Sequence, residues 1–259
     1  MSDSLFDSFN ATLIHQTVDI DHFSEKETIF IWIDILGFKN KLKEGCKNYD
    51  ELADMLSFFQ EIFKEKEGLY KTTVISDGIV LELNPQREQW KFENVKECFD
   101  IIKQKQLEFI LKKKCVVRGA ISVGTSRYNK ENDRNYISNG LSSAYELESK
   151  SIYWPVIGTT QQYLDKMTQL YNESLETSPF KDVFEKTLDP KGEDVYFLDI
   201  YSDLEGSKRE VIEEIINFQL EKNKNTRSVY NKYVWLYKCM HKYKGSVEKL
   251  NPELEKVVL

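Results

Sequence analysis

Glycine and proline are scarce in this sequence, and their scarcity limits how much of the chain can be loop. There are 11 glycines and 5 prolines in 259 residues, about 6% of the chain where roughly 12% is usual. The sequence therefore predicts a protein built mostly of regular helices and strands. Because 41% of the residues are hydrophobic and 13% are aromatic, the chain can bury a sizeable core, which excludes wholesale disorder.

Long hydrophobic runs are also missing. The densest apolar run covers only residues 29–33, whereas a membrane-spanning helix needs about 20 apolar residues. The first 16 residues are polar and lack the basic flank and apolar stretch of a signal peptide. We therefore expect no membrane segment and a cytoplasmic location.

Cysteine and histidine are few and scattered. The four cysteines form no Cys-x-x-Cys motif, so we interpret them as reduced, buried thiols and expect neither a disulfide framework nor a zinc site. The three histidines lie outside the strongly patterned middle of the chain. That position argues against a catalytic triad or a histidine-rich metal site.

Positive charge is in deficit. The chain has 36 lysines and arginines against 43 aspartates and glutamates, a formal net charge of −7. Proteins that bind duplex DNA or anionic membranes concentrate positive charge on one surface, so we expect neither partner. A small anionic ligand held at a local site remains compatible with this charge.

Strand and helix patterns alternate through the middle of the chain, after a polar lead-in at residues 1–26. Their order predicts an α+β fold, with a ferredoxin-like βαββαβ core and helices on one side of an antiparallel-rich sheet. We expect a catalytic domain over 27–200 and a C-terminal helical extension over 201–259. The expected strands cover 29–33, 71–75, 79–83, 115–125 and 193–200, and the expected helices cover 49–66, 91–112, 141–149, 159–172 and 204–244.

Two aspartates stand at the ends of expected strands. Asp34 ends the apolar run, and Asp77 precedes Gly78 in a turn between two β-rich runs, which is a strong hairpin signal. If these strands are neighbours, both carboxylates leave the sheet at one edge and repel each other unless a cation lies between them. A hard divalent ion such as Mg²⁺ takes oxygen ligands and keeps positions open for phosphates.

The loop after Asp34 suits a phosphate. It contains Gly37 and opens a helix, whose free backbone N–H groups can hold an anion, and Lys39 and Lys41 add local positive charge. Together these features predict a metal-dependent nucleotide site. The alternative stays open, because an aspartate at a strand end is commonly a helix cap and an aspartate in Asp-Gly is an ordinary turn residue.

Four short motifs give residues 27–200 a resemblance to the catalytic domain of class III nucleotidyl cyclases. They are IDILGF at 33–38, ISDG at 75–78, VRGAISVG at 117–124 and AYELE at 144–148. The sequence is especially similar to the bacterial anti-phage pyrimidine cyclases of the Pycsar systems. The late WLY at 235–237 resembles the same group.

The resemblance implies an enzyme that cyclises a nucleoside triphosphate and releases pyrophosphate. It implies a head-to-tail homodimer with active sites built from both chains, and two divalent ions, Mg²⁺ or Mn²⁺, in each site. By motif match, Asp34, Asp77 and the main-chain carbonyl of Ile35 hold the metal. The residues that the resemblance places near substrate are Gly37, Phe38, Lys39 and Thr73.

The sequence departs from the family pattern at three positions. Thr73 stands where purine cyclases have a base-reading lysine, and Ser142 and Glu146 stand where the family has an asparagine and an arginine that stabilise the transition state. Loss of the lysine favours a pyrimidine substrate or a relaxed base preference. Loss of the asparagine and arginine means that another cation substitutes or that the domain is weakly active.

Arg118 is the leading substitute for the missing arginine. It lies in an expected strand beside the small residues Ala120 and Ser122, which leave space for a ligand above that face. The alternative is a structural ion pair, the usual state of a buried arginine. Lys150 and Arg127 are weaker candidates.

Aromatic residues raise two further expectations. Tyr136 and Tyr145 are able to stack on a base, although an aromatic in helical register is more often part of the core. The aromatic helix expected at 228–244 packs on the catalytic domain or contributes to a dimer surface, and we favour both roles together.

The predicted function is a cyclase that converts UTP or CTP to the 3′,5′-cyclic monophosphate, a second messenger that acts in anti-phage defence on a cyclic-nucleotide-binding effector. Two alternatives remain. One is a catalytically degenerate module with the cyclase fold that binds a nucleotide without turnover, and the other is a purine cyclase.

Overall fold

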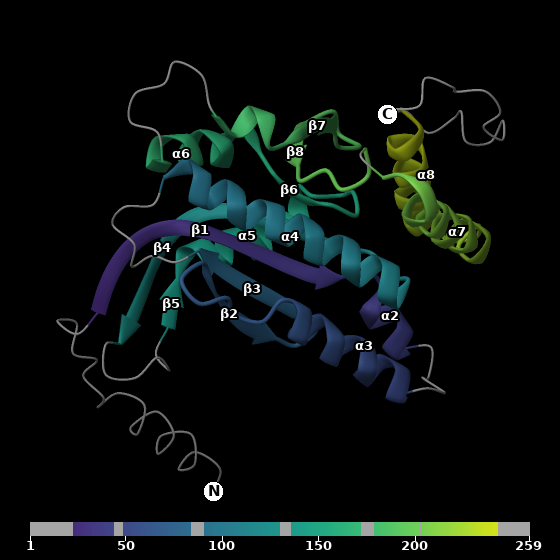
Figure 1. Cartoon of the computed structure of the whole chain (residues 1–259), viewed down its shortest axis with the longest axis horizontal. Coiled ribbons are helices and arrows are strands. Elements are labelled where there is room, and N and C mark those ends of the chain that lie inside the picture. The colour runs from purple at the N-terminus through teal and green to yellow at the C-terminus, as the bar shows by residue number, and fades with distance from the viewer. Residues whose placement is uncertain are drawn as a thin grey trace, which may run out of the picture.

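One mixed β-sheet organises the part of the chain that the structure describes (Figure 1). The computed structural model describes residues 23–43, 49–83, 91–129, 136–171, 179–202 and 204–242. The sheet order is β2-β3-β1-β4-β6-β8-β7, with β5 paired to β4, and β4 and β6 run parallel. The strands are β1 (Phe23–Ile35), β2 (Tyr70–Ile75), β3 (Gly78–Leu83), β4 (Val117–Asn129), β5 (Tyr136–Ser138), β6 (Ile157–Thr159), β7 (Glu185–Leu188) and β8 (Asp194–Phe197).

Helices cover both faces of the sheet, and the predicted α+β class is confirmed. Their boundaries follow the apolar spacing closely, as in α3, where Leu52, Met55 and Phe59 are the buried positions. The helices are α2 (Phe38–Lys43), α3 (Tyr49–Ile62), α4 (Phe92–Lys113), α5 (Asn139–Lys150), α6 (Gln161–Tyr171), α7 (Gly206–Lys222) and α8 (Arg227–Lys242), with a short 3-10 turn, η2 (Pro179–Asp182).

The central strand β1 is buried on both faces, as its continuous apolar run predicts. Ile29, Ile31, Ile33 and Ile35 belong to the main core, which also contains buried residues of α3, α4 and α6. On the opposite face, Phe30 and Trp32 pack with Ala144 of α5. Because side chains alternate along a strand, every even-numbered residue of this stretch, Asp34 included, points to the α5 face.

The prediction that helices lie on one side of the sheet is wrong for α5. This helix lies against β4 on the face opposite α3 and α4, where the small residues of β4 allow a close approach. The Ser122 hydroxyl donates a hydrogen bond of 2.7 Å to the Gly140 carbonyl, and Ala120 shares a buried cluster with Leu147. The space expected for a ligand above Ala120 and Ser122 is therefore filled by α5.

The β2–β3 hairpin forms where the Asp-Gly signal predicts it, although the residue with positive φ in the turn is Ser76 and not Gly78. Ser76, with a φ of 58°, takes the left-handed conformation that a glycine usually provides in a tight hairpin turn. Gly78 is required for another reason, because a Cβ atom there would overlap the indole ring of Trp32. The glycine thus lets the tryptophan of β1 cover the hairpin.

The C-terminal helices α7 and α8 stack on each other at the end of the sheet toward which β1 runs (Figure 1). Their buried residues form a second core with Val116, just before β4, and with the segment after α5. The indole rings of Trp154 and Trp235 stack there, 5.3 Å apart and 9° from parallel. The expectation that the aromatic C-terminal helix packs on the rest of the protein is confirmed.

Other expectations have mixed outcomes. No strong pattern predicted the short strands β5 and β7, and β1 begins at Phe23, inside the expected lead-in. Cys98, Cys115 and Cys239 are buried and form no disulfide, as expected, whereas Cys46 lies outside the described residues. Among the helices of the described ranges, none combines the length and hydropathy needed to cross a bilayer.

Candidate functional site

Asp34 lies next to the last residue of β1, at the edge where three strands meet. Its backbone is opposite Gly78 of β3 and opposite Arg118 of β4. Asp77 is the second residue of the two-residue turn and directly precedes Gly78. The structure thus brings together the two aspartates that the sequence places 43 positions apart.

The electrostatics of this pair favour a bound cation. Burial raises the pKa of Asp34 to about 7, and the negative charges of Asp77 and Glu148 add to this effect. The guanidinium of Arg118 and a hydrogen bond from the Ile35 backbone oppose the rise in pKa but do not cancel it. A half-buried carboxylate with a second carboxylate beside it is under-compensated, and a divalent ion relieves this imbalance.

The residues present fit an open metal site better than a closed one. In the ranges that the structure describes, no three histidine, cysteine, aspartate or glutamate side chains gather as a metal cluster. Asp34, Asp77 and the Ile35 carbonyl offer oxygen ligands only, the type preferred by Mg²⁺ and Mn²⁺. A site with so few protein ligands leaves coordination positions for water and phosphate oxygens.

Arg118 forms an ion pair, which is the alternative to ligand binding that the sequence left open for a buried arginine. Its guanidinium contacts the carboxylate of Glu148 in α5, and both side chains are largely buried. The guanidinium also donates a hydrogen bond of 3.4 Å to the carbonyl of Ile152. Burial raises the pKa of Glu148, and Arg118 opposes that rise. Arg118 is therefore fixed beside Asp34, within the same group of charges.

Sequence reasoning missed two members of this group, Glu148 and Lys232. A signal existed for Glu148, because Ala144, Leu147 and Glu148 share the buried face of α5 at helical spacing, and a carboxylate on that face needs a cationic partner. No comparable signal marked Lys232, which lies in α8, 114 positions after Arg118. Only the packing of the C-terminal helices brings it near Arg118 and Glu148, whose charges affect its pKa.

The expected substrate-binding residues occupy different environments. Gly37 and Lys39 are exposed at the start of α2, whereas the Phe38 side chain is buried in the main core. Only the backbone of Phe38 is therefore available to a ligand. Thr73 is exposed on the edge strand β2 and lies opposite Val80, so its side chain points to the same face as Trp32 and Asp34.

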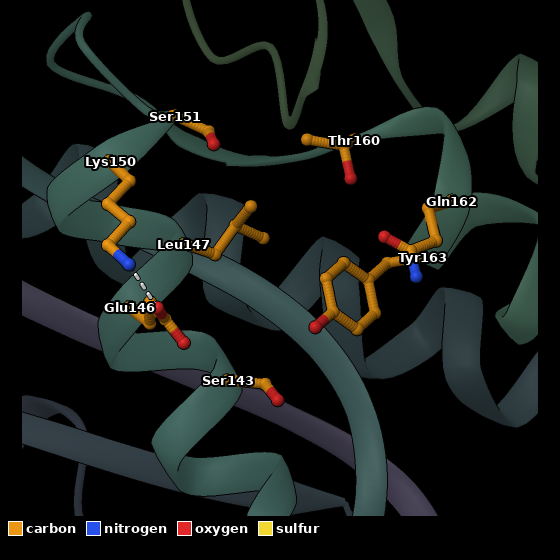
Figure 2. Close-up of a pocket in the computed structure, with 8 residues that line it drawn as sticks. All are labelled: Ser143, Glu146, Leu147, Lys150, Ser151, Thr160, Gln162 and Tyr163. Atoms are coloured by element: carbon orange, nitrogen blue, oxygen red, sulfur yellow. Dashed lines mark hydrogen bonds and ion pairs between the residues drawn. The ribbon is translucent and has the colours of Figure 1, made fainter.

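The outer face of α5 carries the two positions that depart from the family pattern. Ser142 and Glu146 are exposed, and Glu146 forms an ion pair with Lys150, which is 69% exposed. Figure 2 shows Glu146, Lys150, Ser143 and Tyr163 around a hollow of about 220 Å³ between α5 and the start of α6. This hollow is on a different side of α5 from Glu148 and is not lined by either aspartate of the pair.

Among the aromatic candidates, Tyr145 is 56% exposed and meets the Trp32 ring edge to face at 5.3 Å. It therefore stands on the same side of the sheet as Asp34. The side chains of Tyr136 and Arg127 lie outside the part of the structure that is described.

Comparison with known proteins identifies the fold. No family model matches the sequence, and no curated protein matches it. The crystal structure of the adenylyl cyclase CyaB from Pseudomonas aeruginosa has a TM-score of 0.50 and 16% identity, covering 71% of this chain and 99% of that one.

Two further solved structures are less similar. The guanylyl cyclase domain of the RhoGC fusion protein from Blastocladiella emersonii has a TM-score of 0.46 and 14% identity, covering 69% of this chain and 97% of that one. A class III adenylyl cyclase-like ATP-binding protein from Pseudomonas aeruginosa has a TM-score of 0.45 and 11% identity, covering 76% of this chain and 43% of that one. On the match to CyaB, the chain has the fold of a class III nucleotidyl cyclase domain.

Proposed function

We propose that the protein is a nucleotidyl cyclase that converts a pyrimidine nucleoside triphosphate, UTP or CTP, to its 3′,5′-cyclic monophosphate. The observation that carries the proposal is the Asp34 and Asp77 pair beside Arg118 at one edge of a cyclase-fold sheet. In the reaction, the ribose 3′-oxygen bonds to the α-phosphorus, the bond from that phosphorus to the pyrophosphate oxygen breaks, and the hydroxyl proton is lost to solvent or a base.

The residues of the site divide this chemistry between them. Asp34, Asp77 and the Ile35 carbonyl would hold two divalent ions, Mg²⁺ or Mn²⁺, which supply Lewis acidity at the phosphates and lower the pKa of the attacking hydroxyl. Arg118 places a fixed positive charge next to Asp34, where it faces the phosphate chain. Gly37 and Lys39 are exposed at the start of α2, which follows Asp34 closely in the chain, and would be available to the same phosphate chain.

We propose that the active unit is a head-to-tail homodimer with shared sites. On the α5 face, Ile75 is 40% exposed and Tyr145 is 56% exposed, and both flank the aspartates. An apolar surface beside a charged site suits a second copy of the chain. The exposed positions of α5, including Ser142 and Glu146, would then face the partner's site.

Thr73 supports a pyrimidine substrate. A threonine side chain is too short to reach a base in the way that a lysine does and carries no positive charge, so the purine-reading interaction is lost. The resemblance to Pycsar cyclases extends the proposal to an anti-phage second messenger, made in the cytoplasm and read by a cyclic-nucleotide-binding effector.

Two experiments separate this function from its alternatives. Incubation with each of the four nucleoside triphosphates and Mn²⁺, followed by mass spectrometry, identifies the product and its base. A cyclic purine nucleotide would select the purine cyclase alternative, which the adenylyl and guanylyl cyclases named among the structural matches keep open.

The second candidate function is a nucleotide-binding module without turnover. Ser142 and Glu146 favour it, since neither supplies the positive charge that the family places on this helix. Calorimetry that detects triphosphate binding, together with no cyclic product at high protein concentration, would select this function over catalysis.

A further inference from the structure

The C-terminal helix α8 reaches the group of charges beside Asp34. The Tyr153 hydroxyl donates a hydrogen bond of 3.3 Å to the Ser228 carbonyl near the start of α8. One residue further on, the stacked rings of Trp154 and Trp235 fix the middle of the helix against the same segment. Lys232 lies between these two contacts along α8, and its ammonium group is 5.2 Å from the centroid of the Tyr153 ring.

Arg118 and Lys232 therefore approach the same short segment from two sides. Arg118 donates a hydrogen bond to the carbonyl of Ile152, and Lys232 covers the ring of the next residue, Tyr153. The two cations come from β4 and α8, which are distant in the sequence. Arg118 is in turn directly opposite Asp34 in the β1–β4 register, so Arg118 borders the proposed metal site and Lys232 is close to Arg118.

The charges in this group do not balance. Glu148 pairs with Arg118, but in the described part of the chain no carboxylate lies within ion-pair distance of Lys232. Burial, together with repulsion from Arg118, lowers the pKa of Lys232 to about 8, although Glu148 acts in the opposite direction. A half-buried ammonium group without a carboxylate partner is costly, and an incoming anion would remove that cost.

We propose that Lys232 binds the phosphate chain of the substrate together with Arg118, so that α8 is part of the active site. This inference rests on the proposed function and deepens it, since it names the second cation of a site that lacks the usual transition-state arginine. The occupant is a polyphosphate, because two cations beside a divalent-metal site match a chain of several negative charges. The C-terminal helices then do more than stabilise the fold, because they complete the substrate site.

The test uses inorganic tripolyphosphate, which probes the phosphate site without requiring turnover. Calorimetry on the full chain, with the same Mg²⁺ concentration in cell and syringe, compares wild type with Lys232→Met, Lys232→Arg and the control Lys208→Met, which removes an exposed lysine of α7. We expect Lys232→Met to weaken binding about tenfold or more. Lys232→Arg should stay within about threefold of wild type, and Lys208→Met should be unchanged.

Thermal unfolding of the same proteins separates this role from a structural one. Methionine has a similar volume and no buried charge, so Lys232→Met should melt at the same temperature as wild type or higher. A lower melting temperature with unchanged tripolyphosphate affinity would show a structural lysine and overturn the inference. Wild-type protein that fails to bind tripolyphosphate would overturn it as well.

The outcome is distinguishable from failure of the cyclase proposal. If no triphosphate is cyclised but Lys232→Met still loses tripolyphosphate binding, the proposal that Lys232 binds phosphate is supported and the cyclase proposal is rejected. If wild type makes a cyclic nucleotide and Lys232→Met keeps the same kcat/KM, the cyclase proposal is supported and the proposed role of Lys232 is rejected.

Discussion

At Asp34, the stability of the fold and the proposed function oppose each other. In the folded protein, burial and the neighbouring charge of Asp77 raise its pKa from 3.8 to about 7. Between these two pH values the folded protein retains a proton that the unfolded chain has lost. The folded state is therefore penalised as pH rises through this window, and the penalty is complete above about pH 7.

Replacing Asp34 with asparagine should remove that penalty. We expect Asp34→Asn to be more stable than wild type at pH 8 by about 1–2 kcal/mol, a value kept small because Asp34 is only half-buried. The difference should shrink toward zero near pH 4. Urea denaturation at both pH values measures it, and equal stabilities at pH 8 would contradict the buried-carboxylate account.

The pair formed by Arg118 and Glu148 gives a second prediction at this scale. Arg118→Met leaves the carboxylate of Glu148 buried without its partner, so it should cost about 3 kcal/mol of unfolding free energy. The double variant Arg118→Met/Glu148→Leu should recover most of that loss, because it removes the stranded charge. If the double variant loses as much unfolding free energy as the two single variants lose together, the two side chains are not coupled, which contradicts the ion pair in the structure.

At the scale of elements, the position of α5 depends on a close approach to the sheet. A Cβ atom at Gly140 would overlap the ring of Phe30, and one at Gly124 would touch the backbone of Gly140. Because Phe30 is fully buried, its ring has little room to move. This contact sets how closely α5, and with it Glu148, lies to Arg118.

Gly140→Ala should therefore destabilise the protein by about 1–3 kcal/mol through overpacking. The matched control is Gly192→Ala, at a glycine in the β7–β8 turn where a Cβ atom meets nothing within 4 Å but the φ of 84° adds strain. In Gly140→Ala, truncating the clashing ring with Phe30→Leu should restore part of the loss. In Gly192→Ala, the same second change should only add destabilisation.

The elements also show what could be predicted from sequence. Strong periodic patterns predicted α3, α4 and α6 to within about four residues at each end, because each pattern is local, whereas they located β1 but not its start at Phe23. The strands β5 and β7 are short, with three and four residues, and have no comparable pattern. The aspartate pair was predictable because both residues stand at strand ends, whereas Lys232 depends on how α8 packs, which no local pattern encodes.

At the scale of the whole molecule, the net charge of −7 is compatible with an anionic substrate. In the proposed site, Arg118 of β4, Lys232 of α8 and the divalent ions that the aspartates would hold together supply the positive charge for such a substrate. The proposed homodimer also concerns the whole molecule. Its surface would include the exposed side chains of Tyr145 and Ile75, which border the aspartates on the α5 face.

Tyr145→Glu should disrupt the proposed homodimer and reduce cyclase activity about tenfold or more, since it places a charge in an apolar interface. Phe218→Glu is the control, because Phe218 is an exposed aromatic of α7, 65% accessible, away from that face. Light scattering and thermal melting report assembly and folding separately. A Tyr145→Glu protein that remains dimeric and active would show that this face is not the interface.

The most direct test of the central claim is product formation from UTP and from CTP with Mn²⁺, followed by mass spectrometry. The account predicts a 3′,5′-cyclic pyrimidine nucleotide and pyrophosphate from wild type and from Asp165→Ala, which changes an exposed aspartate of α6. Asp34→Ala and Asp77→Ala should lose at least about 100-fold of that activity, since each removes a proposed metal ligand. No cyclic product from wild type, or an undiminished yield from Asp34→Ala, would contradict the account.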